Sequence, residues 1–85
     1  MNYRVEYSEE AMLQLGRLDN AVTRRIMKKI ESSIVEPTEH FKRLTGFPEY
    51  KLRVGDYSVI ADIDTKKGLI LIRTLGHRRD IYKKL

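Results

Sequence analysis

The chain has 85 residues, enough for one small domain, and its 41% hydrophobic and 34% charged residues suit a globular chain rather than a disordered one. It has no cysteine, which excludes disulfides, thiolate chemistry and cysteine-based zinc sites. The net charge of +5 belongs to the second half, since residues 1–40 carry six basic and seven acidic side chains and residues 41–85 carry eleven and five. So uneven a basic charge indicates a polyanionic or acidic partner, with a merely solvated surface as the alternative.

The N-terminal segment predicts a short strand followed by a helix. YRVEY, residues 3–7, alternates between polar and apolar side chains and is rich in β-forming residues. Ser8 can cap a helix over residues 8–18, whose first turn holds two glutamates where the helix dipole favours them. Gly16 either weakens this helix or lies where another backbone approaches closely.

A second helix is predicted to follow, capped by Asp19 or Asn20 and ended by Pro37. Its apolar side chains recur every fourth residue and indicate one stripe that packs in the core: Val22, Ile26, Ile30 and Ile34. Its outer face is basic, which is either solvated or used to bind an anion: Arg24, Arg25, Lys28 and Lys29.

The rest of the chain predicts a connecting loop and three strands. The loop covers residues 36–48 and contains both prolines. The order strand, helix, helix, strand, strand, strand predicts a single α+β domain over residues 1–85, with two helices packed on one face of a small, mostly antiparallel four-stranded sheet. The first strand is free to pair parallel to a later one, and the opposite face has no helix of its own. The three strands are expected at residues 49–54, 57–63 and 69–75.

The open face of this sheet is predicted to gather positive charge. Lys51 and Arg53 are two residues apart in one strand and therefore point to the same face, where they repel each other unless an anion lies between them. Ser58 is expected to share this face, because its neighbours Tyr57 and Val59 suit the core. A helical turn in the tail would place Arg78 and Tyr82 on one side, four residues apart.

These side chains suit an anionic phosphodiester. An arginine fork binds phosphate oxygens bidentately, a lysine binds them as a point charge, and a tyrosine can stack on a base or transfer a proton. The only histidines, His40 and His77, have no ligand spacing around them, so neither a metal nor another cofactor is indicated.

Two stretches resemble the RelE/ParE superfamily of bacterial and archaeal toxins, and the likeness spans nearly the whole chain. They are RLTGFPEYKLRVGDYSVI, residues 43–60, and LGHRRDIY, residues 75–82. Family members typically show K/R-L-x-G, a proline, Y-K-L/I-K/R and G-D-Y-R-V, and later G-x-R-x-x-I/V-Y. Each short motif is weak alone, but all of them in this order and spacing make a specific match, closest to the RelE branch.

The resemblance implies the toxin of a type II toxin–antitoxin system, a ribosome-dependent endoribonuclease that cuts mRNA in the A site by metal-independent attack of a 2′-OH on phosphorus. By position, Lys51 and Arg53 would help to activate the 2′-OH and stabilise charge. Arg78 would bind the phosphate or assist the leaving group, and Tyr82 would stack on the base or share proton transfer. Further RNA contacts are implied for Arg24, Arg25, Lys28, Lys29, His77 and Arg79.

One residue departs from the family pattern. Ser58 stands where G-D-Y-R-V has an arginine, a principal cation of the active members. Losing one preorganised donor to a developing anion costs about 10²–10³ in rate. We therefore hypothesise a weakened or silent nuclease, arising from natural decay or from an attenuating change. Arg73 and Arg79 are the candidates to replace the missing charge, although neither is at the family position.

The resemblance also implies the partners and two alternatives. A small acidic RelB-like antitoxin would hold the toxin, the ribosome and mRNA would be its targets, and operator DNA would be bound only through the antitoxin. The alternatives are a ParE-like toxin that inhibits gyrase and a non-catalytic antitoxin-binding module. No run approaches the ~20 apolar residues that cross a membrane, and the N-terminus lacks the apolar core of a signal peptide, so a cytoplasmic protein is expected.

Overall fold

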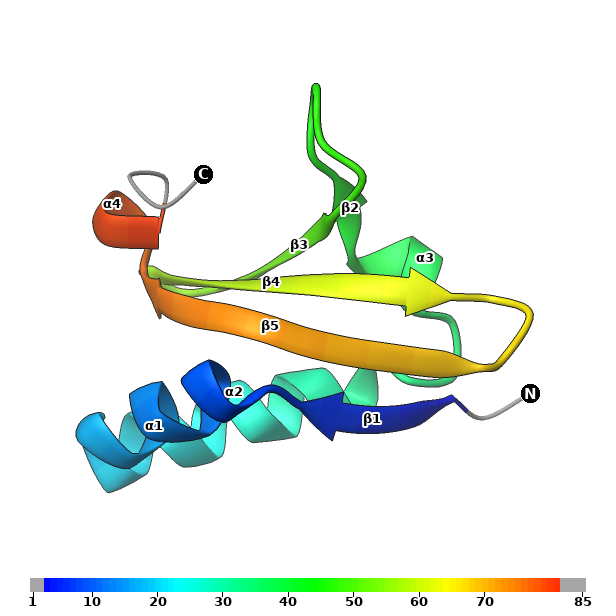
Figure 1. Cartoon of the computed structure of the whole chain (residues 1–85). Coiled ribbons are helices and arrows are strands. Elements are labelled where there is room, and N and C mark those ends of the chain that lie inside the picture. Colours follow the sequence, from blue (N-terminus) through cyan, green and yellow to red (C-terminus); the bar gives the residue numbers. More distant parts are fainter. Residues whose placement is uncertain (1–2, 82–85) are drawn as a thin grey trace.

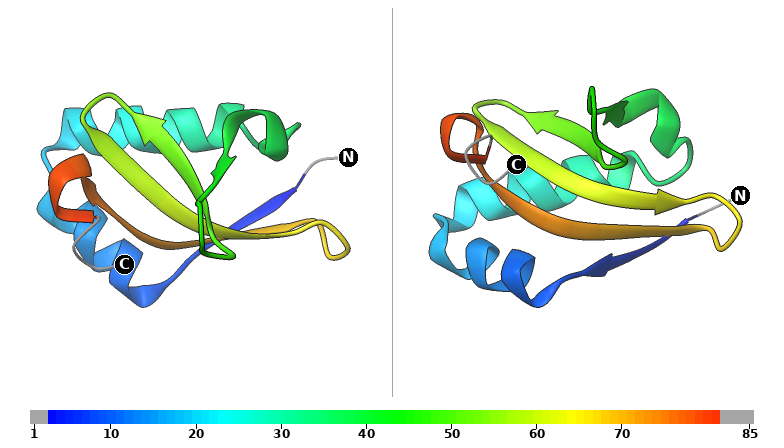
Figure 2. Two further views of the ribbon diagram at one scale, coloured as in Figure 1. Left: turned by 90° about the horizontal axis from the view of Figure 1, so that it is seen from above. Right: turned by 45° about the horizontal axis from the view of Figure 1, so that its top comes forward.

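A computed structural model describes residues 3–81 and shows two helices beneath one face of a twisted sheet (Figure 1). The two long helices lie on one side of the sheet, and the β2–β3 connection stands on the other (Figures 1 and 2). No helix in this described part is long and apolar enough to cross a membrane. The elements are β1 (Arg4–Tyr7), α1 (Glu9–Arg17), α2 (Asn20–Ser32), α3 (Pro37–His40), β2 (Lys42–Arg43), β3 (Tyr50–Val54), β4 (Tyr57–Asp64), β5 (Leu69–His77) and α4 (Arg78–Ile81).

The sheet confirms the predicted α+β fold but has five strands rather than four. Its order is β1-β5-β4-β3-β2, with β1 parallel to β5 and every other pair antiparallel. The additional strand lies in residues 36–48, so the prediction of a plain loop there was wrong. Pro37 opens the short helix α3, where its fixed φ and missing N–H are tolerated, and the two residues of β2 pair with β3.

The start of α1 confirms the prediction that Ser8 caps it. The Ser8 hydroxyl accepts a hydrogen bond from the backbone N–H of Ala11 at 3.0 Å and donates one to the carbonyl of Arg73 at 2.6 Å. One side chain therefore caps the helix and ties its start to β5. Gly16 is exposed, and a Cβ added to it would meet no atom of another segment within 4 Å, so of the two predicted alternatives the close backbone approach is wrong.

Helix α2 begins as predicted but ends earlier. The Asp19 carboxylate accepts from the N–H of Ala21 at 3.2 Å, which selects Asp19 over Asn20 as the cap. The helix ends at Ser32, and Ile34 packs against the core from outside the helix. All four residues of the predicted stripe pack in or against the core, although Ile34, the last of them, is not helical.

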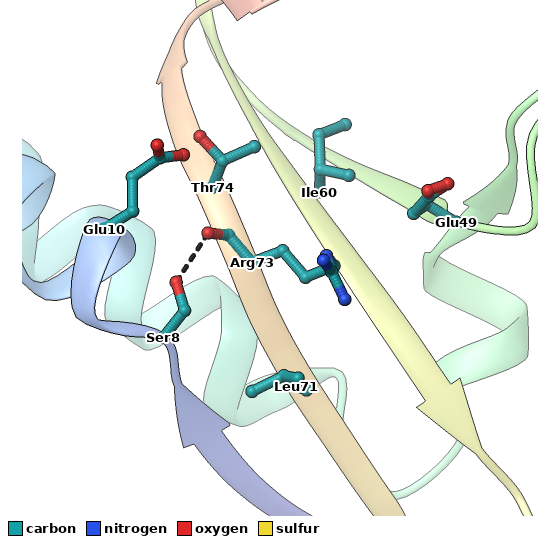
Figure 3. Close-up of a pocket in the computed structure, with 7 residues that line it drawn as sticks. All are labelled: Ser8, Glu10, Glu49, Ile60, Leu71, Arg73 and Thr74. Atoms are coloured by element: carbon teal, nitrogen blue, oxygen red, sulfur yellow. Dashed lines mark hydrogen bonds between the residues drawn. The ribbon is translucent and has the colours of Figure 1, made fainter. Parts of the chain in front are cut away.

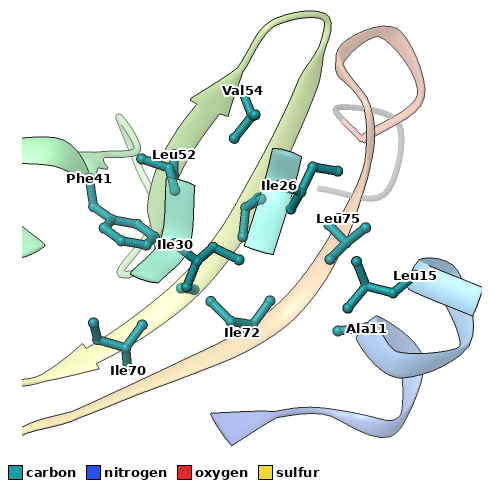
Figure 4. Packing of buried hydrophobic residues seen from close by; sticks show 12 residues of the cluster. Ala11, Leu15, Ile26, Ile30, Phe41, Leu52, Val54, Ile70, Ile72 and Leu75 are labelled. Atoms are coloured by element: carbon teal, nitrogen blue, oxygen red, sulfur yellow. The ribbon is translucent and has the colours of Figure 1, made fainter. Parts of the chain in front are cut away.

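The core lies between the two long helices and the sheet (Figure 4). It draws on both helices and on β3, β4 and β5, because their alternating side chains face the helices. Its burial supplies the main stabilisation of so small a domain. The buried members are Ala11, Leu15, Ile26, Ile30, Phe41, Leu52, Val54, Val59, Ala61, Ile70, Ile72 and Leu75.

Strand β5 is longer than predicted and contains a bulge. Ile60 of β4 pairs with Thr74 whereas Ala61 pairs with Ile72, so Arg73 is an extra residue in β5. The side-chain amide of Gln14 binds both residues that follow the bulge. Its oxygen accepts a hydrogen bond from the backbone N–H of Leu75 at 2.8 Å, and its nitrogen donates one to the hydroxyl of Thr74 at 2.9 Å. The bulge sets which residues of β5 reach the open face.

Candidate functional site

The two-residue turn between β3 and β4, Gly55 and Asp56, organises one end of the open face. The Arg53 Nε donates to the carbonyl of Gly55 at 3.3 Å. The backbone N–H of Arg78, at the start of α4, donates to the carbonyl of Asp56 at 2.7 Å. Two arginines from segments distant in the sequence are thus attached to adjacent carbonyls of the same turn.

A third arginine reaches this turn from α2. Gly55 has φ +59°, the left-handed region that favours glycine, and a Cβ placed on it would lie 3.6 Å from the Arg25 Nη2. The positive φ is what calls for glycine at this position, and the 3.6 Å separation shows that the Arg25 guanidinium packs against the turn. The other basic residues predicted on this helix are exposed, and their RNA contacts remain predictions: Arg24, Lys28 and Lys29.

Charge at this end is largely uncompensated. We call Arg25, Arg53, Arg78 and Arg79 the arginine cluster. All four are exposed, and none forms an ion pair with a carboxylate of residues 3–81. Asp56 lines a shallow cavity of about 400 Å³ together with Arg78, Arg79 and His77. Arg53 and Arg78 are both attached to the same turn, and like charges brought to one place favour the binding of an anion.

His77 lies in β5 rather than in the tail where the sequence placed it. Its Nδ1 accepts a hydrogen bond from the N–H of Arg79 at 3.2 Å, and its ring meets Tyr57 edge-on, with centroids 5.7 Å apart. A nitrogen that accepts this bond carries no proton, so the neutral ring holds its proton on Nε2. In this arrangement His77 is a hydrogen-bond donor for an anion and has no free lone pair with which to act as a base.

Lys51 occupies the open face as predicted. It lies opposite Lys42 of β2 and Ile60 of β4, is half-buried, and is one position along the same face from Arg53. The register therefore brings the predicted pair of β3 cations to the same side of the sheet as the start of α4. Tyr82, the fourth predicted catalytic residue, lies outside the described residues.

Ser58 is on the open face as predicted, yet it is 1% exposed. It lies between Arg53 on one side and Gly76 on the other, and its hydroxyl has no hydrogen-bond partner. Helix α4 covers this place: Ile81 is 1% exposed, and its Cδ1 lies 4.0 Å from where a Cβ on Gly76 would be. The space above the position of the family arginine is thus occupied by the protein itself.

Arg73, one of the two candidates to replace the missing arginine, already has an acidic partner on the sheet. Its Nη1 forms an ion pair with the Asp62 Oδ2 at 2.7 Å, and that hydrogen bond and charge raise the pKa of Arg73, with Glu49 adding to the effect. Arg79 remains the nearer candidate, since it belongs to the arginine cluster and lines the cavity beside Asp56.

A larger cavity of about 660 Å³ lies further along the open face and was missed by the sequence analysis (Figure 3). We call it the acidic groove, because Glu10 of α1 and Glu49 of the β2–β3 connection stand on its two sides (Figure 3). Glu10 and Glu49 are far apart in the sequence and in no motif, so only the folded chain brings them to one place. The full lining is Ser8, Glu10, Glu49, Ile60, Leu71, Arg73 and Thr74.

Comparisons with known proteins agree on one group. The model of a family described as "ParE toxin of type II toxin-antitoxin system, parDE" matches residues 5–82. A putative RelE-like toxin protein of Escherichia coli is 24% identical over 87 residues, which cover 96% of this chain and 92% of that protein.

Solved structures match along almost the whole chain. The toxin–antitoxin complex RelBE2 from Mycobacterium tuberculosis matches with a TM-score of 0.82 and 21% identity, covering 92% of this chain and 100% of the matched chain. The archaeal RelE–RelB complex from Pyrococcus horikoshii OT3 matches with a TM-score of 0.79 and 29% identity, covering 94% and 99%. Both matches support the same fold over more than nine-tenths of this chain.

Proposed function

The chain belongs to the RelE/ParE superfamily of type II toxin–antitoxin toxins, and on that premise we propose that it is a ribosome-dependent endoribonuclease that cuts mRNA in the A site. The observation that carries the proposal is the arginine cluster around the β3–β4 turn, exposed and without carboxylate partners in residues 3–81. Its position beside Lys51 on a rigid sheet suits the binding of a phosphodiester.

In the proposed reaction the 2′-OH of one nucleotide attacks the adjacent phosphorus and gives its proton to a base. The bond from phosphorus to the 5′-oxygen breaks, that oxygen takes up a proton, and a 2′,3′-cyclic phosphate remains. Arg53 and Arg78 are proposed to hold the non-bridging oxygens, where they would stabilise the charge of the phosphorane. Lys51 and Tyr82 are proposed to assist proton transfer, with His77 donating a further hydrogen bond through Nε2.

The proposal includes a weakened activity. At position 58 the chain offers a buried hydroxyl beneath α4 and therefore no charge to a bound phosphate. Relative to an active site that holds an arginine there, about 10²–10³ in rate would be lost. Arg79 is the residue best placed to offset this loss, because it lines the cavity that Arg78 and His77 also line.

The test is cleavage of a defined mRNA on paused ribosomes, with the new 5′ ends mapped by primer extension. Arg53→Gln and Arg78→Gln are each expected to lower the rate of A-site cleavage by about 10²–10³. Arg4→Gln is the matched control, since Arg4 is an exposed arginine paired with Glu6 on β1, away from the cluster. Equal rates for all three variants would refute the assignment, as would the absence of any cut by the natural chain.

A second candidate function is supported by the family model, which bears the name of ParE toxins. In this alternative the protein inhibits DNA gyrase and the arginine cluster has no catalytic duty. A supercoiling assay with DNA gyrase and a stoichiometric amount of this protein distinguishes the two functions. Inhibition that survives Arg53→Gln and Arg78→Gln, without mRNA cleavage, would favour the ParE alternative.

We further propose that a small acidic RelB-type antitoxin binds this chain, and that operator DNA is reached only through it. The matched structures from Mycobacterium tuberculosis and Pyrococcus horikoshii are a RelBE2 toxin–antitoxin complex and a RelE–RelB complex. The net charge of +5 favours an acidic partner electrostatically. Non-catalytic antitoxin binding would be the remaining function if neither mRNA cleavage nor gyrase inhibition were found.

A further inference from the structure

The β2–β3 connection, residues 44–49, stands on the side of the sheet opposite the two long helices and holds an aromatic ring in solvent (Figures 1 and 2). The backbone N–H of Phe47 donates to the carbonyl of Leu44 at 3.2 Å, and Gly46 supplies the φ of +83° that this turn needs at its third residue. Pro48 further restricts the backbone of Phe47. Phe47 is nevertheless 42% exposed. Because its backbone is already fixed, the ring can contact a ligand at a low cost in conformational entropy.

A pair of lysines lies at the base of this connection. Lys42 of β2 is directly opposite Lys51 of β3, so the two side chains point to the same face of the sheet, the open one. Lys42 is exposed and forms no ion pair with a carboxylate of residues 3–81. Like charges directly opposite each other on neighbouring strands destabilise a sheet. An anion close to both ammonium groups would remove that repulsion.

The lysine pair continues the positive charge of the arginine cluster across the sheet. Lys51 and Arg53 are two positions apart on β3, roughly 7 Å along the strand, and they share the open face. Neighbouring phosphates of one nucleic-acid strand can match such a spacing. Glu49, the acidic residue of the connection, lines the acidic groove together with Arg73, and the two opposite charges attract each other there. The negative charge nearest the lysine pair is thus already offset.

An exposed aromatic ring beside paired cations suits single-stranded nucleic acid, because the cations hold the backbone while a base stacks on the ring. A single exposed phenylalanine is common on protein surfaces. What distinguishes Phe47 is the pair of Lys42 and Lys51 at the base of its own turn. An acidic protein segment is the other class of partner for these groups. Single-stranded RNA is favoured, because one strand can extend from a phosphate at the arginine cluster to the lysine pair.

We propose that Phe47, Lys42 and Lys51 form a subsite for a nucleotide of single-stranded RNA that flanks the cleaved phosphodiester. The base stacks on Phe47, and its phosphate lies between the two ammonium groups. This inference rests on the proposed function in one respect, the placement of the cleaved phosphodiester at the arginine cluster. Phe47 and Lys42 are binding residues with no part in proton transfer, and they fix how the strand crosses the open face.

The first experiment measures, by fluorescence anisotropy, the affinity of the purified chain for a short single-stranded RNA with 2′-fluoro groups, which lacks the attacking hydroxyl. Phe47→Ala is expected to weaken binding about 5- to 100-fold without changing its salt dependence. Lys42→Gln is expected to weaken binding and to reduce the slope of log affinity against log salt by about 0.7. Leu13→Ala and Lys66→Gln are the matched controls, because Leu13 is 57% exposed on α1 and Lys66 is exposed between β4 and β5.

The second experiment replaces each nucleotide in turn by an abasic one. At one position the loss of the base should weaken binding to the natural chain as much as Phe47→Ala does, and should have little further effect on Phe47→Ala, since both remove the same contact. The proposal is overturned if the RNA does not bind, if either variant behaves like its control, or if no position shows this coupling, as expected for a ring that contacts an acidic protein segment instead.

The two assays also separate this inference from the nuclease assignment. The 2′-fluoro RNA is only bound, so coupling between Phe47 and one base would stand even if no mRNA were cleaved on ribosomes. Cleavage in the A site without such coupling would uphold the proposed function and overturn the subsite.

Discussion

Two buried serines give opposite predictions for the same substitution. Ser58 and Ser33 are 1% and 0% exposed, but the Ser33 hydroxyl donates to the carbonyl of Lys29 at 2.7 Å whereas the Ser58 hydroxyl has no partner. A buried polar group without a hydrogen bond costs about 1–3 kcal/mol, and a typical hydrogen bond contributes about 0.5–1.5 kcal/mol. Ser58→Ala should therefore raise the free energy of unfolding by about 1 kcal/mol, and Ser33→Ala should lower it by about the same amount.

The measurement is urea and thermal denaturation of the two variants and the natural chain under identical conditions. For a domain of this size, 1 kcal/mol shifts the midpoint of thermal unfolding by roughly 4–8 °C, so the two variants should lie on opposite sides of the natural protein. If Ser58→Ala were destabilised as much as Ser33→Ala, the Ser58 hydroxyl would have a partner in solution. The description of position 58 as an unused polar site beneath α4 would then be refuted.

Three further predictions concern the scaffold, each measured by the free energy of unfolding in urea. Gly55→Ala should destabilise the protein by about 1–2 kcal/mol, because the φ of Gly55 is +59°. Gly16→Ala should stabilise it by about 0.5–1 kcal/mol, because Gly16 is an exposed helical residue with free space around it, and equal effects of the two variants would contradict the turn geometry. Gln14→Ala should cost about 1–3 kcal/mol, since it leaves groups of the β5 bulge without partners, and a neutral result would mean that the bulge needs no support. Burial, and then the charge of Glu31, raise the pKa of Tyr7 above 10.0, so the stability that is present below about pH 10 should fall as the pH rises through the native pKa. Tyr7→Phe should make this fall shallower, and an unchanged dependence of the free energy of unfolding on pH would exclude Tyr7 as its source.

The fold was predictable where the chain repeats a simple period. The fourfold spacing of Val22, Ile26 and Ile30 and the alternation along the strands identify the buried faces without further information. Strand β2 was not predictable, because two residues carry no period and pair only through the register of β3. The bulge at Arg73 was not predictable for a similar reason. One inserted residue leaves no pattern in the sequence, and contacts with the distant helix α1 fix its position.

The candidate site divides in the same way. Strand alternation was enough to place Lys51, Arg53 and Ser58 on one face, because side-chain direction in a strand depends only on position. The approach of Arg25 to the β3–β4 turn could not be inferred, since it depends on where α2 crosses the sheet. The sequence therefore indicates which residue types are available, and the packing of helix on sheet decides which of them meet.

The burial of Ser58 changes what restoring the family arginine would require. Ser58 and Gly76 are paired neighbours with minimal side chains, and Ile81 packs over Gly76. An arginine at position 58 would have to emerge where α4 now covers the sheet, and a charge held there without a partner is costly. The serine, the glycine and the isoleucine thus behave as one packing unit rather than as a single lost catalytic group. Loss of the arginine and close docking of α4 are two aspects of the same local structure, and a change at position 58 must be judged by its effect on both.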